Sequence, residues 1–339
     1  MKILILGGSG YIGKRLADML SATAWAVPVI GARNPRNAAA AGAPSVVVDT
    51  CNLLALTETL RGVDAVVNCV AGDEHSIAEG ARVMVQAARD VNCRRIVQLS
   101  TMSVYGAREG WVREDSPLDP GLGWYGRAKC QAEHHVVGFS RQGGEAVIVR
   151  PGCVFGPGSE LWVGRVGRWL QTRRLGDLGI GGDGWSNLVH VDDVCRAVMA
   201  SLQLPVSRNE VPVFNLSAPD SPRWNTYFVD LALSIQATPV KRISARQIQC
   251  DTLLLSPPLK VAQRAIDKLG VGRNVLADPM PPGLARLWSQ HIQLDASRAS
   301  RGLGLTWTPY SVALENSASW FLRRGALTDG QMGKAVCTR

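Results

Sequence analysis

Short apolar runs alternate along the first half of the chain with longer segments in which apolar residues recur at helical spacing. The short runs predict strands, and the longer segments predict helices of the length that joins parallel strands. The expected strands are residues 2–6, 26–30, 46–49, 65–70, 95–100 and 146–150. This alternation predicts an α/β fold in which a doubly wound parallel sheet is covered by helices on both faces.

A glycine-rich turn joins the first expected strand to the helix after it. Its glycines, Gly7, Gly10 and Gly13, follow the spacing Gly-x-x-Gly-x-x-Gly. Glycines at such a junction let the backbone approach a pyrophosphate, which the amides of the helix N-terminus then hold. The turn therefore predicts a Rossmann-type dinucleotide site. The residues expected to contact the cofactor here are Gly7, Ser9, Gly10, Tyr11, Ile12 and Gly13.

Residues at the ends of the next strands bear on which dinucleotide binds. Arg33 follows the second strand, where an acidic residue would bind the ribose 2′-hydroxyl of NAD and an arginine suits the 2′-phosphate of NADP. Arg33 thus favours NADP over NAD, with a solvent-facing loop arginine as the alternative. Asp49 is expected either at the adenine edge or as the cap of the following helix. Small residues such as Ala71, after the fourth strand, let the cofactor pass close to the backbone.

A phenol and an ammonium group lie four residues apart in Tyr125 and Lys129, within a segment that is expected to be helical. Residues at that spacing share one helix face. A nearby ammonium group favours the phenolate, so we expect the pKa of Tyr125 to fall from about 10. Such a tyrosine can exchange a proton with a substrate hydroxyl. A chance spacing on a solvated helix face is the alternative.

Several ordered motifs extend this pattern over most of the chain. They are Gly7-x-x-Gly10-x-x-Gly13, Ser100-Thr101-x-x-Val104-Tyr105-Gly106, Tyr125-x-x-x-Lys129, Arg150-Pro151-Gly152, Val189-His190-Val191-Asp192-Asp193-Val194, and Leu303-Gly304-Leu305 before Trp307-Thr308-Pro309. In these motifs the chain resembles the extended short-chain dehydrogenase/reductase (NAD-dependent epimerase/dehydratase) superfamily. The resemblance implies that Thr101 hydrogen-bonds the reacting oxygen and that Tyr125 is the acid/base. It also implies that Lys129 tunes Tyr125 and holds the nicotinamide ribose.

The resemblance adds further candidates and excludes one reaction. Ser100 is the neighbour that could take the role of Thr101. Sugar dehydratases of this group carry an Asp-Glu pair directly after the threonine, whereas this chain has Met102 and Ser103, so dehydration is not expected. Tyr125, Lys129, Pro151 and Cys153 are expected to contact the cofactor. Met102, Ser103, Arg165 and Trp185 are the expected substrate contacts.

The second half of the chain has a looser pattern. We expect a dinucleotide-binding domain at residues 1–160. Residues 161–339 should combine return segments at about 185–217 with a smaller C-terminal substrate lobe. Residues 164–176 are expected to form a basic helix that either meets a substrate phosphate or faces solvent. The apolar run at 252–261 is interpreted as the core of the lobe, with a substrate channel as the alternative.

Composition narrows the class of protein. Hydrophobic residues at 46% and charged residues at 19% are typical of a soluble globular protein, and no apolar run is long enough to span a membrane. The net charge of +9 comes from dispersed basic residues, and the eight cysteines show no metal-binding spacing. We therefore expect a cytoplasmic protein with a small-molecule substrate and no metal, nucleic-acid or membrane partner. A homodimer through the Tyr125 helix is a further hypothesis.

These features together predict an NAD(P)-dependent oxidoreductase. It would transfer hydride at a secondary alcohol or ketone carbon of a nucleotide-sugar-like or related small molecule. One alternative is a nucleotide-sugar epimerase with tightly bound NAD, and another is a reductase or dehydrogenase of a lipophilic, sterol-like or polyketide-like substrate. A third is a non-catalytic NADP(H) sensor, against which the presence of Thr101, Tyr125 and Lys129 argues.

Overall fold

The chain folds into two compact units. The computed structural model describes residues 1–34, 43–119, 121, 123–269 and 277–336. The larger unit comprises residues 1–152, 189–219 and 294–307, and the second unit comprises 153–188, 220–293 and 308–339. Residues 294–307 thus join the larger unit, which the sequence pattern did not indicate.

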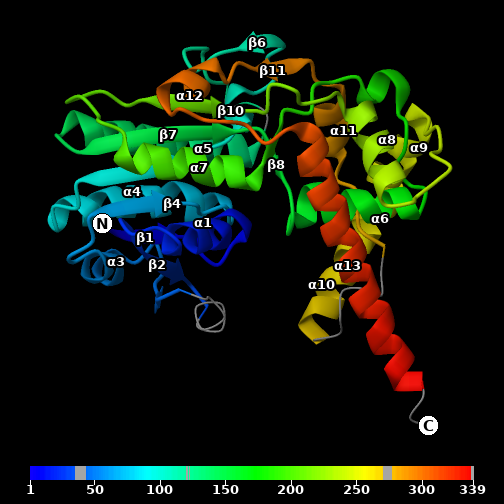
Figure 1. Cartoon of the computed structure of the whole chain (residues 1–339), viewed down its shortest axis with the longest axis horizontal. Coiled ribbons are helices and arrows are strands. Elements are labelled where there is room, and N and C mark those ends of the chain that lie inside the picture. Colours follow the sequence, from blue (N-terminus) through cyan, green and yellow to red (C-terminus); the bar gives the residue numbers. More distant parts are fainter. Residues whose placement is uncertain (35–42, 120, 122, 270–276, 337–339) are drawn as a thin grey trace. The chain divides into compact units, whose positions relative to one another are not determined.

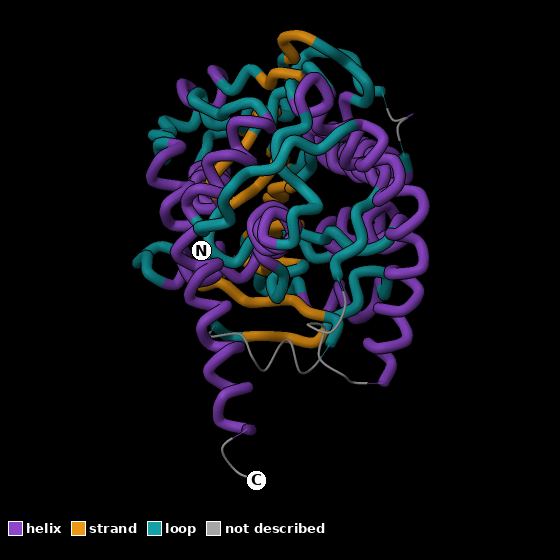
Figure 2. The backbone as a smooth tube through the Cα atoms, turned by 90° about the vertical axis from the view of Figure 1, so that its right-hand side faces the viewer, coloured by secondary structure: helices purple, strands orange, loops and turns teal. Residues whose placement is uncertain are grey.

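A seven-stranded sheet forms the centre of the larger unit (Figure 1). Its strand order is β10-β7-β5-β4-β1-β2-β3, and every neighbouring pair is parallel. The strands are β1 Lys2–Leu6, β2 Val27–Ala32, β3 Ser45–Val47, β4 Ala65–Asn68, β5 Arg95–Leu99, β7 Glu145–Pro151 and β10 Val213–Leu216. The predicted doubly wound sheet is confirmed, and β10 adds an edge strand that was not predicted. The strands can be followed in orange in Figure 2.

Helices cover both faces of this sheet. They are α1 Tyr11–Ser21, α3 Leu53–Thr59, α4 Glu74–Asp90, α5 Trp124–Arg141, α7 Val191–Gln203 and α12 Ser297–Gly302. Alternate strand residues such as Leu4 and Leu6 pack with α3, α4 and α5 in one apolar cluster, while α1 packs beside α7. Ala132 and Val136 of α5 are fully buried within this unit. Those two residues are therefore not available to a dimer interface.

The second unit is mainly helical. It contains α6 Arg165–Gln171, α8 Trp224–Ser234, α9 Ala245–Cys250, α10 Ser256–Leu269, α11 Pro282–Ser289 and α13 Tyr310–Val336. Four short strands lie outside the seven-stranded sheet. They are β6 Gly110–Val112 of the larger unit, β8 Cys153–Phe155 of the second unit, β9 Leu188–His190 and β11 Ile292–Leu294. The core of the second unit is aromatic. Its buried rings include Trp169, Trp224, Tyr227, Phe228 and Trp288.

Two expectations for the second unit are wrong. The basic helix expected over 164–176 is shorter, because α6 ends at Gln171 and Arg173 takes the left-handed conformation that closes helices (φ 56°). Arg168 and Arg174 are paired with Asp278 and Asp251. The apolar run at 252–261 is not core either. Leu253, Leu254 and Leu255 are exposed, because polar side chains of the same segment occupy its inner face.

Candidate functional site

Helix α5 places Tyr125 and Lys129 at the carboxyl ends of β4 and β5. The Lys129 ammonium is buried and donates to the carbonyl oxygens of Val70 (2.9 Å) and Leu99 (2.8 Å). Its Nζ lies 5.9 Å from the centre of the Tyr125 ring. Gly126 allows α5 to approach closely, because a Cβ there would lie 2.8 Å from the carbonyl oxygen of Ser103. The predicted pair therefore stands beside the segment that follows β5.

The electrostatics of this pair differ from the expectation. Burial raises the pKa of Tyr125 to about 12, and burial lowers the pKa of Lys129 from 10.5 to about 8. The expected lowering of the Tyr125 pKa is thus wrong for the protein alone. The physical reason is that burial of the phenol disfavours the phenolate, while the Lys129 ammonium is bound by two carbonyl oxygens and lies over the ring. Around neutral pH the Tyr125 hydroxyl is therefore protonated.

Hydroxyl groups gather where β5 ends. Thr101 begins the short 3-10 helix Met102–Tyr105: its Oγ1 accepts from the backbone N–H of Ser103 at 3.2 Å. The Ser100 Oγ is buried and has no hydrogen-bond partner among the described residues. A buried hydroxyl without a protein partner is suited to hydrogen-bond a ligand. Of the two expected substrate contacts here, Met102 is buried and Ser103 is exposed.

A buried polar network holds this segment in place, and the sequence did not reveal it. The Arg150 guanidinium forms a two-pronged ion pair with Glu133 of α5, at 2.9 and 2.6 Å. It also donates to the Tyr105 hydroxyl at 2.8 Å, which in turn donates to Asn215 of β10 at 2.7 Å. The only signal was an arginine inside the apolar strand that ends at Pro151. The network fixes the backbone that carries Ser100 and Thr101.

The glycine turn has the shape expected of a phosphate cradle. Gly7 has a φ of 72°, and a Cβ on Gly13 would lie 2.6 Å from the Gly7 carbonyl oxygen. The N-cap residue of α1 is Gly10, which has no side chain that could cover the first amides of the helix. Ser9 and Gly10 are exposed, while Tyr11 and Ile12 are half-buried at the start of α1. These residues fit a dinucleotide pyrophosphate.

Arg33 follows β2 and turns toward the start of α4. Its Nη1 donates to Ser76 Oγ at 3.1 Å and lies 4.0 Å from an Asp73 carboxylate oxygen. The pKa of Asp73 is lowered to about 2, mainly by the hydrogen bond from the Ser76 backbone N–H and to a smaller extent by the charge of Arg33. A 2′-phosphate at Arg33 would share the guanidinium with these two groups.

The residues after β3 and β4 take local roles. Asp49 accepts from the backbone N–H of Cys51 at 3.0 Å, and Asn52 rather than Asp49 caps α3. The capping role considered for Asp49 is therefore wrong. Ala71 is exposed after β4, where it leaves the backbone open. Asp49 and Ala71 remain predicted cofactor contacts.

Comparison with known proteins decides the family. A sequence profile described as NAD dependent epimerase/dehydratase family matches residues 3–217, which is more than half of the chain. The chain belongs to this family. The predicted extended short-chain dehydrogenase/reductase type is confirmed, and the protein is an NAD(P)-dependent oxidoreductase or epimerase.

Individual relatives within this family are distant. Protein YeeZ of Escherichia coli K12 is 28% identical over 253 residues, covering 68% of this chain and 83% of that protein. Sterol demethylase protein B of Methylococcus capsulatus is 25% identical, covering 96% of this chain and 100% of its own. The structure of UDP-glucose 4-epimerase from Thermotoga maritima is similar in fold, with a TM-score of 0.72 and 18% identity, over 96% of this chain and 100% of that one.

The remaining candidates lie at or beyond the end of β7. Pro151 is buried in the larger unit, one residue before the end of its first segment at Gly152. Cys153, Arg165 and Trp185 belong to the second unit, where Cys153 is buried, Arg165 is half-buried and Trp185 stacks with Arg223 at 4.7 Å. Their contribution to the site of this family member stays a prediction.

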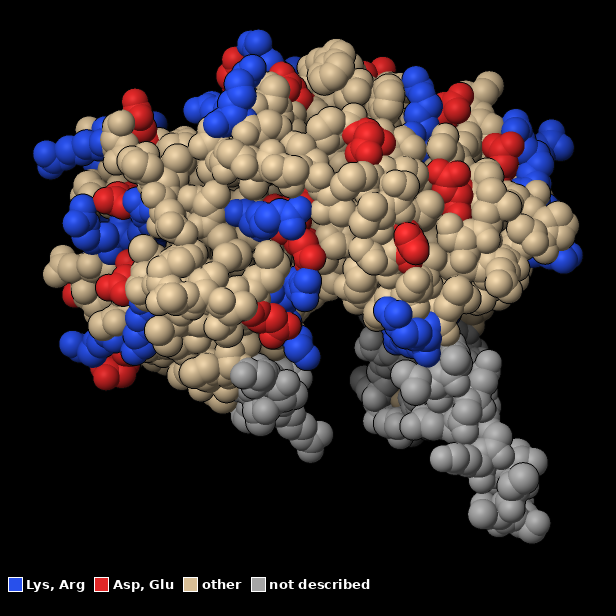
Figure 3. All heavy atoms as spheres, in the orientation of Figure 1, with Lys and Arg blue, Asp and Glu red and all other residues tan. Residues whose placement is uncertain are grey.

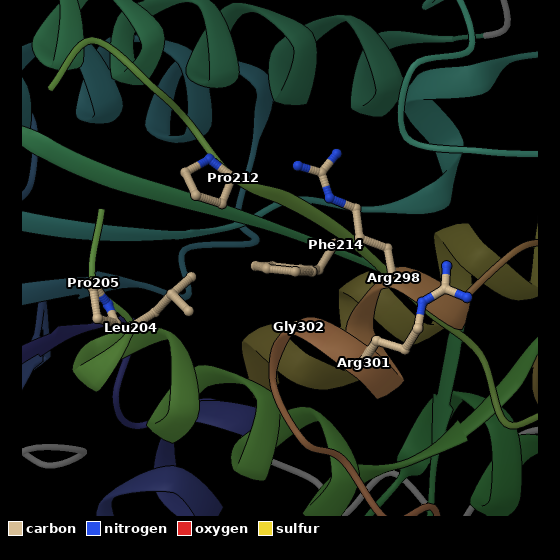
Figure 4. Close-up of a pocket in the computed structure, with 7 residues that line it drawn as sticks. All are labelled: Leu204, Pro205, Pro212, Phe214, Arg298, Arg301 and Gly302. Carbon is tan, nitrogen blue, oxygen red and sulfur yellow. The ribbon is translucent and has the colours of Figure 1, made fainter. Parts of the chain in front are cut away.

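A separate hollow of about 420 Å³ lies at the opposite end of the sheet, at the amino end of β10 (Figure 4). Leu204, Pro205, Pro212, Phe214, Arg298, Arg301 and Gly302 line it. The Arg298 guanidinium stacks over Phe214 at 5.8 Å. This hollow lies where α12 packs on β10, away from Thr101. Its lining residues lie outside the motifs that the chain shares with the family.

Charge and metal chemistry add little to this picture. On the face shown in Figure 3, basic and acidic side chains are interspersed. Within the described part of the chain no group of three or more His, Cys, Asp or Glu side chains could hold a metal ion.

Proposed function

We propose that this protein catalyses NADP(H)-dependent oxidoreduction at a secondary alcohol or ketone carbon of a lipophilic small molecule, with release of the cofactor after each turnover. The observation that carries the proposal is the packing of Tyr125 and Lys129 against the segment that bears Ser100 and Thr101. The glycine turn lies in the same unit, at the same end of the parallel sheet.

The residues present fit a dinucleotide. The amides at Gly10 and after it would hold the pyrophosphate, Arg33 the 2′-phosphate, and Lys129 the nicotinamide ribose. The bound cofactor would supply or accept the hydride. Neighbouring structures bind NAD, so the choice of NADP rests on Arg33 alone.

The proton is the part of the chemistry that the chain supplies. Because the Tyr125 hydroxyl stays protonated around neutral pH, it is suited to donate to the oxygen of a ketone as that oxygen gains charge. The Ser100 or Thr101 hydroxyl would hydrogen-bond the same oxygen, and the unpaired Ser100 Oγ makes it the stronger candidate. Lys129 would stabilise the tyrosinate left behind. These roles favour reduction as the working direction.

Two relatives support a lipophilic substrate. Besides sterol demethylase protein B, a ketoreductase of a farnesylated dihydroquinoline oxide from Stigmatella aurantiaca is 24% identical over 218 residues. A nucleotide-linked sugar is the second candidate. It is favoured by the surplus of basic over acidic residues in the second unit, 17 against 10.

The test follows NADPH and NADH consumption with a panel of hydrophobic ketones and UDP-sugars. We expect net NADPH oxidation with a ketone, and the Tyr125→Phe variant should lose at least about 100-fold in kcat while its affinity for NADPH, from fluorescence titration, is retained. Ser100→Ala and Thr101→Val, compared side by side, identify which hydroxyl binds the oxygen.

Cofactor choice is tested separately. Arg33→Ser should weaken NADPH binding by about tenfold or more and leave NADH binding unchanged. Sugar epimerisation without net NADPH consumption, or full turnover by Tyr125→Phe, would overturn the proposal.

A further inference from the structure

The helical segment 245–269 of the second unit exposes large apolar side chains and buries polar ones. Its α9 and α10 helices are joined by a π-helical turn, Asp251–Leu255. Large apolar side chains on this segment face outward: Leu253 is 59% exposed, Leu254 68%, Leu255 56% and Val261 68%. Pro257 and Pro258 are exposed between them. We call these six residues the apolar ridge.

Polar side chains occupy the inner face of the same segment. Asp251, Thr252 and Ser256 are buried. Asp251 forms a two-pronged ion pair with Arg174, at 2.7 and 2.5 Å, and Ser256 Oγ accepts from the backbone N–H of Met280 at 2.6 Å. These bonds fix the rotation of the segment. Turning the leucines inward would break the buried ion pair between Arg174 and Asp251, which is costly.

The ridge has the spacing of one continuous surface. Leu253, Pro257 and Val261 follow one another at intervals of four, and so do Leu254 and Pro258, so they share one helix face. Single exposed leucines are common on proteins, but a contiguous exposed apolar patch marks a surface that binds something apolar.

Charge identifies the kind of partner. Residues 241–269 include six basic and two acidic residues, of which Asp251 is paired with Arg174 and Arg242 is paired with Asp177. Arg246 and Lys260 are exposed on the segment. A second copy of this unit would bring like charges together, whereas an anionic lipid surface offers both negative charge and apolar depth.

We propose that the apolar ridge docks the protein on the surface of an anionic lipid bilayer. Leu253, Leu254 and Val261 would enter the boundary between headgroups and acyl chains while Lys260 and Arg246 meet the headgroups. Among the described residues no helix is long and apolar enough to cross a bilayer, so the ridge lies on the membrane. The expectation of no membrane partner considered only spanning segments. This proposal stands apart from the proposed reaction, because it concerns vesicle binding and not turnover.

Vesicle flotation with the full-length protein tests the inference. The probes are vesicles of phosphatidylcholine alone and of phosphatidylcholine with roughly one-third phosphatidylglycerol. We expect binding to the anionic vesicles that weakens at high salt. Replacing both Leu253 and Leu254 by Ser should weaken this binding by at least about tenfold. The matched control is Leu54→Ser, a leucine 84% exposed on α3 of the larger unit, which should bind as the wild type does.

Three results would overturn the inference. One is no flotation with either vesicle, a measurement that needs no variant. Another is flotation that the double variant keeps. The last is a wild-type dimer that the double variant converts to a monomer in light scattering without any vesicle binding, which would assign the ridge to a second copy. Thermal unfolding checks that the variants are folded, and NADPH turnover in the absence of lipid should be unchanged in both.

Discussion

Replacing Glu133 with Ala tests how much the buried network contributes to the fold. Glu133 and Arg150 are 4% and 5% exposed and form a two-pronged ion pair. The substitution leaves the Arg150 guanidinium buried with two neutral acceptors among the described residues, the Tyr105 hydroxyl and the Glu114 carbonyl oxygen. Breaking one side of such a pair costs about 3–5 kcal/mol. For a unit of about 200 residues the melting temperature should then fall by on the order of 10 °C.

The matched control is Glu79→Ala. Glu79 meets Arg82 in the same two-pronged geometry, at 2.9 and 2.7 Å, but both side chains lie on the surface of α4. Its loss should cost about 0.5 kcal/mol or less. Both variants are measured by denaturant titration of the free energy of unfolding. An equal loss in the two variants would refute the reasoning that burial sets the cost.

The same variant has a second readout in activity. Arg150 holds the Tyr105 hydroxyl, and Tyr105 ends the short helix that Thr101 begins. Because it loosens this segment, Glu133→Ala should lower kcat much more than Glu79→Ala does, when both are measured at a temperature where they remain folded. The more conservative Glu133→Gln keeps one acceptor for Arg150 and should restore part of both losses.

Two further predictions concern the cofactor cradle and pH. Gly13→Ala places a Cβ about 2.6 Å from the Gly7 carbonyl oxygen, so NADPH affinity in a fluorescence titration should drop by about tenfold or more; an unchanged affinity would contradict the cradle. Because the pKa of Lys129 falls from 10.5 to about 8 on folding, the unfolded chain binds more protons between those pH values. Lys129 should therefore contribute a rise of about 3 kcal/mol to the free energy of unfolding from pH 8 to 10.5, against the loss expected from buried groups such as Cys69 and Tyr125, whose pKa values burial raises. The difference in stability between the wild type and Lys129→Met should change by that amount over this range, and an identical pH dependence in both proteins would disprove the assignment.

The strands of the sheet were predictable because each is a local apolar run. Residues 2–6 were predicted as a strand and form β1 without change, since a strand of a covered parallel sheet is buried on both faces. β10 is different. It is a four-residue strand with a polar Asn215; a return of the chain at about 185–217 was expected, but no local pattern predicted a strand there or its place beside β7.

The sequence predicted which helix carries the candidate pair, but it did not predict the energetics of that pair. The spacing of Tyr125 and Lys129 placed both on α5, but the sign of the tyrosine pKa shift depends on burial, which spacing does not reveal. The apolar ridge shows the same limit. Leucines at helical spacing suit a core or a surface equally, and the ion pair between Asp251 and Arg174, distant in sequence, decides which face turns inward.

The network around Arg150 also sets the smallest piece of this protein that can be expected to work. A fragment ending at Gly152 would keep the glycine turn, Tyr125 and Lys129. It would lack Asn215, which accepts a hydrogen bond from the Tyr105 hydroxyl. It would also lack the edge strand that covers β7. Any shortened enzyme, chimaera or split version therefore has to retain residues 189–219 with the first 152, even though every proposed catalytic side chain lies before that break.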